Sequence, residues 1–255
     1  MSEPEAQAAV AGGLTQWQRV LYTFTAPSKT FEDIKRGNRS WWLPLIVLGL
    51  VSYLFFGAMV QKVGIRQVSE NQIRMSPQQQ EQMASLTPEQ REQRYKISGA
   101  ITEGIFIAGP VFGMAMAVIF AAVLMGTINF GFGGRAKFSE VFTVVYYAWL
   151  PGLVKILLGT AVIYAGVAPE SFNIRNFAPT NLGAFLDPTD TAKWLYALAT
   201  SLDAVTIWTA VLMGIGVATV AGLKRSSGYI AVFGWWAIIV LFSVGAAVLA
   251  GAMGG

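Results

Sequence analysis

The stretch LPLIVLGLVSYLFFGAMV at residues 43–60 holds no charged side chain. An α-helix that crosses a hydrocarbon core of about 30 Å needs about 20 mostly apolar residues. Three more such runs occupy residues 105–128, 204–223 and 229–252, and a weaker run with one lysine extends over residues 141–167, its membrane part near 145–167. The sequence therefore predicts an all-α integral membrane bundle of five transmembrane helices, with residues 42–252 as the membrane domain.

The overall composition agrees with a membrane protein that carries no catalytic chemistry. Charged residues make up 13% of the 255 residues, whereas soluble domains carry about 25%. Cysteine and histidine are both absent from the sequence, which excludes disulfides, thiolate metal sites and histidine bases. No nucleophile elbow or phosphate-loop signature is present. We therefore expect no catalytic residue, no cofactor and no metal, and a protein that is not an enzyme.

The net charge of +4 is better explained by membrane orientation than by nucleic-acid binding. Basic residues near the span ends are concentrated before the first span, after the second and after the fourth: Lys29, Lys35, Arg36, Arg39, Arg135, Lys137, Lys224 and Arg225. This bias predicts a cytoplasmic N-terminus and a C-terminus outside. The first connection is also basic, although its glutamates dilute the charge.

Residues 1–41 are expected to form an N-terminal interfacial segment. Leu14, Trp17, Leu21 and Phe24 recur at helical spacing, and a second short helix is expected to start at Pro27-Ser28, with Ser28 as its cap and Gly37 as its stop. An apolar stripe beside basic residues can lie in the headgroup layer. The alternatives are a helix that docks on a partner and a simple loop.

The Gln-rich connection at residues 61–100 is expected to be a polar helical loop on the outer side. Ser76-Pro77 and Thr87-Pro88 each place a capping residue before a proline, which predicts two short helices. A solvated excursion is the simpler meaning, and a partner-binding surface is the alternative. The connection at 168–193 is turn-rich and is expected to be a loop over the outer surface.

Small residues recur every fourth position in two of the spans, where they let helix backbones approach closely. These candidate packing residues are Gly109, Gly113, Ala117 and Ala121 in the second span and Ala210, Gly214, Ala218 and Gly222 in the fourth. The stripes predict that these two spans are central in the bundle. The alternative is that they serve a homodimer.

Lys155 is the one charge inside the weaker span and has two interpretations. If the helix begins at Pro151, Lys155 lies one turn inside it and can extend back to the headgroups as an anchor. If the helix is continuous from residue 141, Lys155 lies near mid-membrane and is a functional residue, with Asp203 as its counter-ion. That pairing requires a buckled geometry, because Asp203 is expected at the outer end of the fourth span. Asp203 could also simply cap that span.

Several short motifs resemble the Yip (Ypt-interacting protein) family of five-span membrane proteins. They are Gly109-Pro110, the NFGFGG run at residues 129–134, the VVYYAWLP run at 144–151 that includes Tyr147 and Pro151, and the Gly214-Ile215-Gly216 turn of helix. The start of the chain is similar to shorter, bacterial relatives. The resemblance implies a bacterial plasma (inner) membrane protein and a helix that starts near Pro151, which favours the anchor role for Lys155.

Eukaryotic relatives are associated with Rab-type GTPases and act without catalysis, through membrane interactions and hetero-oligomers. This chain lacks their long cytosolic N-terminal region, so GTPase binding is not carried over. We predict a non-enzymatic membrane organiser, scaffold or trafficking-like adaptor, whose partners are the lipid bilayer and a membrane protein or a second copy of itself. The alternative is a small transporter or channel component with Lys155 and Asp203 on its pathway.

Overall fold

The computed structural model describes residues 13–252, so residues 1–12 of the expected interfacial segment and residues 253–255 lie outside the described part of the chain. Regular structure in residues 13–252 is helical, apart from an isolated bridge between Asn181 and Asp203. Five helical stretches are long and apolar enough to cross a membrane: Trp42–Lys62, Gly109–Gly131, Phe138–Tyr164, Ala204–Ala221 and Arg225–Ala252. The all-α, five-span fold class is thus confirmed.

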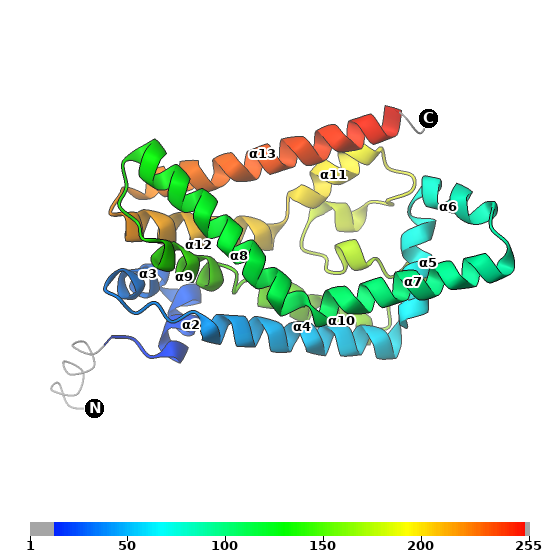
Figure 1. Cartoon of the computed structure of the whole chain (residues 1–255), viewed down its shortest axis with the longest axis horizontal. Coiled ribbons are helices and arrows are strands. Elements are labelled where there is room, and N and C mark those ends of the chain that lie inside the picture. The colour runs from blue at the N-terminus through cyan, green and yellow to red at the C-terminus, as the bar shows by residue number, and fades with distance from the viewer. Residues whose placement is uncertain (1–12, 253–255) are drawn as a thin grey trace. The chain divides into compact units, whose positions relative to one another are not determined.

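The helices follow one another along the chain without long irregular linkers (Figure 1). The α-helices are α2 (Gln16–Thr25), α3 (Pro27–Lys35), α4 (Trp42–Lys62), α5 (Ile65–Arg74), α6 (Pro77–Ala84), α7 (Pro88–Ile107), α8 (Gly109–Gly126), α9 (Phe138–Ala148), α10 (Gly152–Tyr164), α11 (Lys193–Ser201), α12 (Ala204–Ala221) and α13 (Arg225–Ala252). Short π- and 3-10-helices are η1 (Thr127–Gly131), η2 (Pro169–Ser171), η3 (Ile174–Asn176) and η4 (Leu182–Phe185).

The chain divides into two compact units, which we describe separately. Unit 1 comprises Met1–Leu48, Val111–Gly152 and Thr206–Ile238. Unit 2 comprises Gly49–Pro110, Leu153–Val205 and Ile239–Gly255.

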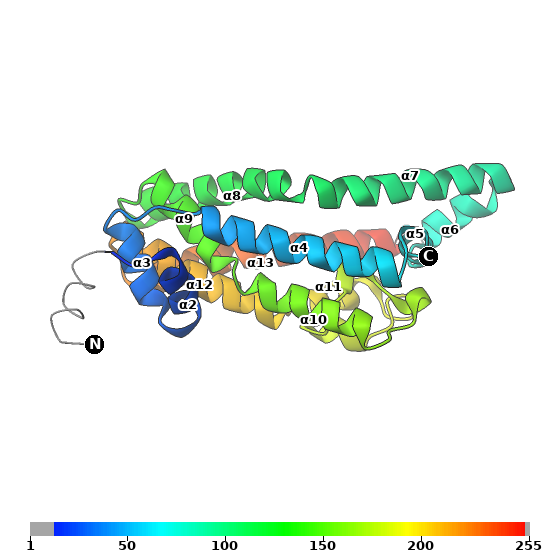
Figure 2. The ribbon, with the colours of Figure 1, turned by 90° about the horizontal axis from the view of Figure 1, so that it is seen from below.

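In unit 1, α2 and α3 form the expected pair of N-terminal helices and lie next to each other (Figure 2). Thr15 and Gln18 make a reciprocal capping box at the start of α2. The start of α3 at Pro27 is confirmed, but Ser28 is not its cap: Ala26 occupies the cap position without a side-chain bond. Ser28 falls inside the first turn, where its hydroxyl accepts a hydrogen bond from Arg225 instead.

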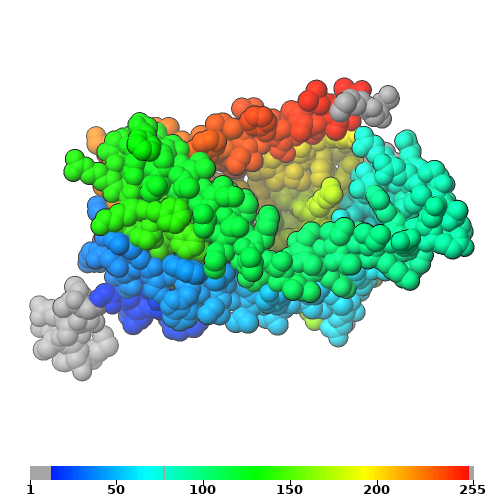
Figure 3. Space-filling view, in the orientation of Figure 1, coloured from blue at the N-terminus to red at the C-terminus, as the bar shows by residue number. Residues whose placement is uncertain are grey.

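The third and fourth spans, rather than the second and fourth, are the most buried. The apolar windows of Phe138–Tyr164 and Ala204–Ala221 are 56% and 61% buried, against 22% for the second span. The side chains of α8 form a broad part of the visible surface, shown in green in Figure 3. The expectation of a central second span is therefore wrong, because the small side chains of α8 occupy only a narrow strip among large lipid-facing ones.

Gly216 of α12 lies where three elements of unit 1 meet. A Cβ atom at Gly216 would lie 2.4 Å from Val144 of α9 and 2.9 Å from the ring of Phe31 of α3. Gly214, on another face of α12, meets Tyr229 of α13 in the same way. Glycine is needed at both positions because no side chain fits between the helices.

The polar connection in unit 2 is more helical than expected. The starts of α6 at Pro77 and of α7 at Pro88 are confirmed, and Thr87 forms a capping box with Gln90. However, α7 is a long helix of 20 residues, and α5 precedes both. Helix α7 ends at Ile107, and Gly109-Pro110 opens α8, because proline is accommodated in the first turn of a helix and breaks a continuing one.

The connection after the third span is an ordered part of unit 2 rather than a plain loop. It contains η2, η3 and η4 and a nine-residue helix, α11. Phe172 is buried in a core cluster with Phe55 and Met59 of α4, and the Phe55 ring lies 4.6 Å from that of Phe177. The prolines correctly indicated turns, but the segment is held in place by Phe172 and Phe177, which pack against Phe55 of α4.

Candidate functional site

Lys155 and Asp203 form an ion pair in unit 2. The Lys155 Nζ donates to Asp203 Oδ2 over 2.9 Å. The Asp203 side chain is 3% exposed, while that of Lys155 is 27% exposed. The pair therefore combines a buried carboxylate with a lysine side chain that is partly exposed.

The segment around Thr180 and Asn181 supplies two more donors to Asp203. Thr180 Oγ1 and Asn181 Nδ2 donate to Asp203 Oδ2 over 2.6 and 3.4 Å. The backbone N–H of Ala204 donates to the Thr180 carbonyl, and the amides of Asn176 and Asn181 bond to each other. Asp203 thus ties the start of α12 to the preceding connection and to α10.

The structure combines parts of both interpretations of Lys155. Helix α10 begins at Gly152, directly after Pro151, so Lys155 lies one turn inside it as the anchor interpretation requires. Nevertheless Lys155 is paired with Asp203, as the functional interpretation expects. The third span is not one continuous helix: α9 ends at Ala148, residues 149–151 form a turn, and α10 begins at Gly152. The pair therefore occurs in a span that is broken just before Lys155, in line with the expected buckled geometry.

A second polar cluster, in unit 1, surrounds Tyr147 of the LP-ending motif. The Tyr147 hydroxyl lies 3.1 Å from Gln16 Oε1 and 3.3 Å from the Ser40 carbonyl, to which it can donate. The Arg19 guanidinium lies over the Tyr147 ring, 5.3 Å from its centre. Tyr147 itself is fully buried in α9. The motif tyrosine therefore joins α9 to the N-terminal helices.

Arg19 and Asp33 are the charged pair of this cluster, and both side chains are 1% exposed. Asp33 accepts hydrogen bonds from the Leu14 N–H over 3.1 Å and from Asn38 over 2.9 Å. Arg19 Nη1 donates to the Asn38 carbonyl over 2.7 Å, and its Nε lies 3.7 Å from Asp33. These contacts lock α2 onto α3. Sequence reasoning missed the pair, and no local motif signals it, because each residue lies among the ordinary charges of a short amphipathic helix.

The candidate packing residues fall into two groups. Ala117, Ala121, Ala210, Gly214 and Ala218 are buried. A methyl group placed on Gly109 or Gly113 would meet no other atom within 4 Å, and Gly222 follows the end of α12 with φ +74°. Gly222 therefore ends the helix through a left-handed backbone conformation rather than packing two helices together.

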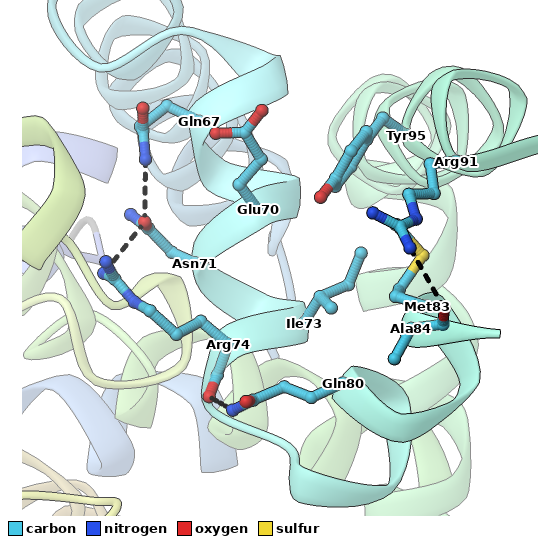
Figure 4. Close-up of a pocket in the computed structure, with 10 residues that line it drawn as sticks. All are labelled: Gln67, Glu70, Asn71, Ile73, Arg74, Gln80, Met83, Ala84, Arg91 and Tyr95. Atoms are coloured by element: carbon cyan, nitrogen blue, oxygen red, sulfur yellow. Dashed lines mark hydrogen bonds between the residues drawn. The ribbon is translucent and has the colours of Figure 1, made fainter. Parts of the chain in front are cut away.

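A cavity of about 480 Å³ lies among α5, α6 and α7 of unit 2 (Figure 4). Ile73 of α5 and Tyr95 of α7 line it, together with Glu70. Glu70 also accepts a hydrogen bond from Arg66, which raises the pKa of the Arg66 guanidinium. The cavity is open and its lining mixes charged, amide and apolar side chains, so it has the character of a surface recess rather than a catalytic cleft. Among residues 13–252, no group of three or more acidic side chains could hold a metal ion.

Comparisons with known proteins give one family and one relative. A family model described as the Yip1 domain matches residues 21–247 of the chain. The sequence is 22% identical over 238 residues to membrane protein YknW of Bacillus subtilis (strain 168), and the alignment covers 92% of each chain. No solved structure matches.

Proposed function

Because the chain belongs to the Yip1 domain family, we propose that this membrane protein acts without catalysis, as an organiser or adaptor that binds a membrane-protein partner or a second copy of itself. The observation that supports this role best is the rigid attachment of α2 and α3. The pair is held by Arg19, Asp33 and Tyr147, and we call it the foot.

The foot carries an apolar face that its own fold leaves uncovered. Trp17 and Leu21, one helical turn apart on α2, are 66% and 59% exposed, whereas Arg19 and Thr23 between and beyond them are buried. Aromatic side chains at a docking surface contribute much contact area. Since the foot is already ordered, partner binding would not have to order it first.

Site-specific photo-crosslinking tests the partner surface in native membranes. A benzophenone amino acid replaces Trp17 or Leu21, and Glu32, an exposed polar position on α3, is the matched control. The proposal expects one specific protein adduct at both apolar positions, lost when Leu21→Glu is introduced beside the Trp17 probe. Adducts to lipid alone at both positions would rule out partner binding through the foot.

The orientation proposed for this protein is a cytoplasmic N-terminus and an outer C-terminus in a bacterial inner membrane. The distribution of Lys and Arg supports it, and the Bacillus relative supports the bacterial setting. Alkaline phosphatase fused after Ser85 should be active outside, and the same enzyme fused after Lys224 should be inactive. The reverse pattern would overturn the orientation. The comparisons give no support to the transporter or channel alternative.

A further inference from the structure

The basic residues of three separate chain segments converge on one place in unit 1. Arg135 donates its backbone N–H to the Ala221 carbonyl over 3.3 Å, which places the loop after η1 against the end of α12. The Lys35 Nζ at the end of α3 lies 3.7 Å from the point where a Cβ atom on Gly222 would lie. Lys224 follows directly on this turn.

The exposed basic side chains in this region have no salt-bridge partner among the described residues. The side chains of Lys35, Arg36, Arg135, Lys137 and Lys224 are exposed, and none of them forms a salt bridge with a residue of the described chain. Two acidic residues lie near. Glu32 is exposed one turn before Lys35, and Glu140 is already occupied by Arg39 and the Lys137 N–H. The surface is strongly positive, and we call Lys35, Arg135 and Lys224 the basic triad.

The triad lies at the ends of apolar helices, which determines the kind of anion it can meet. Lys224 directly precedes α13, and Arg135 follows the second span after a short turn. Phe130 of η1 is 93% exposed. Basic residues at span ends lie at headgroup depth, where the anions are lipid phosphates, and an exposed aromatic ring close by in the chain favours the same depth.

We propose that the basic triad binds the headgroup of an anionic phospholipid, with Phe130 against its acyl chains. This site does not depend on the partner binding proposed above, because Trp17 and Leu21 are not part of it. The alternative is that these cations only stabilise the carboxyl ends of α3 and α12 through the helix dipoles. That role needs no lipid.

The full chain in a neutral detergent allows a direct test. Dihexanoylphosphatidylglycerol and dihexanoylphosphatidylcholine are titrated separately, and the unfolding temperature is followed. We expect the anionic lipid to raise it and the zwitterionic lipid to do so far less. The variant Lys35→Gln/Arg135→Gln/Lys224→Gln should bind the anionic lipid roughly fivefold more weakly per removed charge. The matched variant Arg91→Gln/Arg94→Gln/Lys96→Gln on α7 should bind it like the wild type.

Three results would overturn the proposal: equal shifts with both lipids, an unchanged shift in the triad variant, or an equal shift with millimolar inorganic phosphate, which would indicate a free anion as the ligand. If the triad variant does not fold, the salt dependence of lipid binding by the wild-type protein still tests the proposal. A phosphate-headgroup site must lose lipid affinity as salt is raised, and a shift that is the same at low and high salt contradicts it.

Discussion

The ion pairs Arg19–Asp33 and Lys155–Asp203 are alike in composition and different in burial. In unit 1, Arg19 and Asp33 are both 1% exposed, and Asp33 holds backbone and amide donors from two other segments. In unit 2, Asp203 is equally enclosed, but Lys155 keeps 27% of its side chain exposed. A long flexible ammonium side chain can leave its partner, and an enclosed guanidinium cannot. Arg19–Asp33 should therefore contribute more to the free energy of unfolding than Lys155–Asp203. We call the first pair a lock and the second a tie.

The largest effect is expected from Asp33→Ala. This change leaves the buried Arg19 charge without its counter-ion, and breaking a buried pair in this way costs about 3–5 kcal/mol. Thermal unfolding in detergent should show a large drop in stability, with loss of the ordered foot. The change Glu32→Ala, one residue away and exposed, is the control and should have little effect. A loss below about 1 kcal/mol for Asp33→Ala would mean that Arg19 reaches solvent more easily than its burial indicates.

A smaller loss is expected from Asp203→Ala. The Lys155 side chain is partly exposed and Asn181 keeps its bond to Asn176, so the cost includes the loss of the 2.6 Å hydrogen bond from Thr180 and is expected to be about 2 kcal/mol. The same unfolding assay compares it with Asp33→Ala. If Asp203→Ala were the more damaging of the two, the distinction between a lock and a tie would be wrong.

The next effect is that of Tyr147→Phe. The ring stays under Arg19, and only the hydroxyl contacts with Gln16 and Ser40 are removed. The free energy of unfolding should therefore fall by about 1 kcal/mol. Tyr146→Phe is the matched control, because the neighbouring buried hydroxyl has no hydrogen-bond partner among the described residues. Equal losses in both variants would show that the Tyr147 hydroxyl does not contribute to holding the foot.

The smallest difference expected is one of labelling rate rather than of stability, and single cysteines in a chain that has none can measure it. A membrane-impermeant thiol reagent should label Lys155→Cys more slowly than the exposed Ser85→Cys and faster than the fully buried Thr23→Cys. Labelling of Lys155→Cys as fast as that of Ser85→Cys would indicate a water-filled route and return the transporter alternative to consideration.

The starts of two helices could be predicted because the signals that determine them lie within a few neighbouring residues. Proline at the first helical position, after a residue able to cap, correctly indicated α6 and α7 because both signals act within one turn. Helix α11 was missed because the prolines before it dominate the local pattern. The pairing of Lys155 with Asp203, and its need for a distorted helix, could be proposed from the sequence, but only the tertiary structure places the break between α9 and α10 and brings the two charges together.

Runs of apolar residues longer than the hydrocarbon core, read directly from the chain, were enough for the five spans, because lipid requires every backbone polar group to be bonded within its own helix. Which spans lie inside the bundle could not be read in this way, since small residues allow close packing without specifying the partner. The same holds for Arg19 with Asp33: the charges are visible in the sequence, but only the folding of α2 against α3 removes both from solvent and makes them depend on each other.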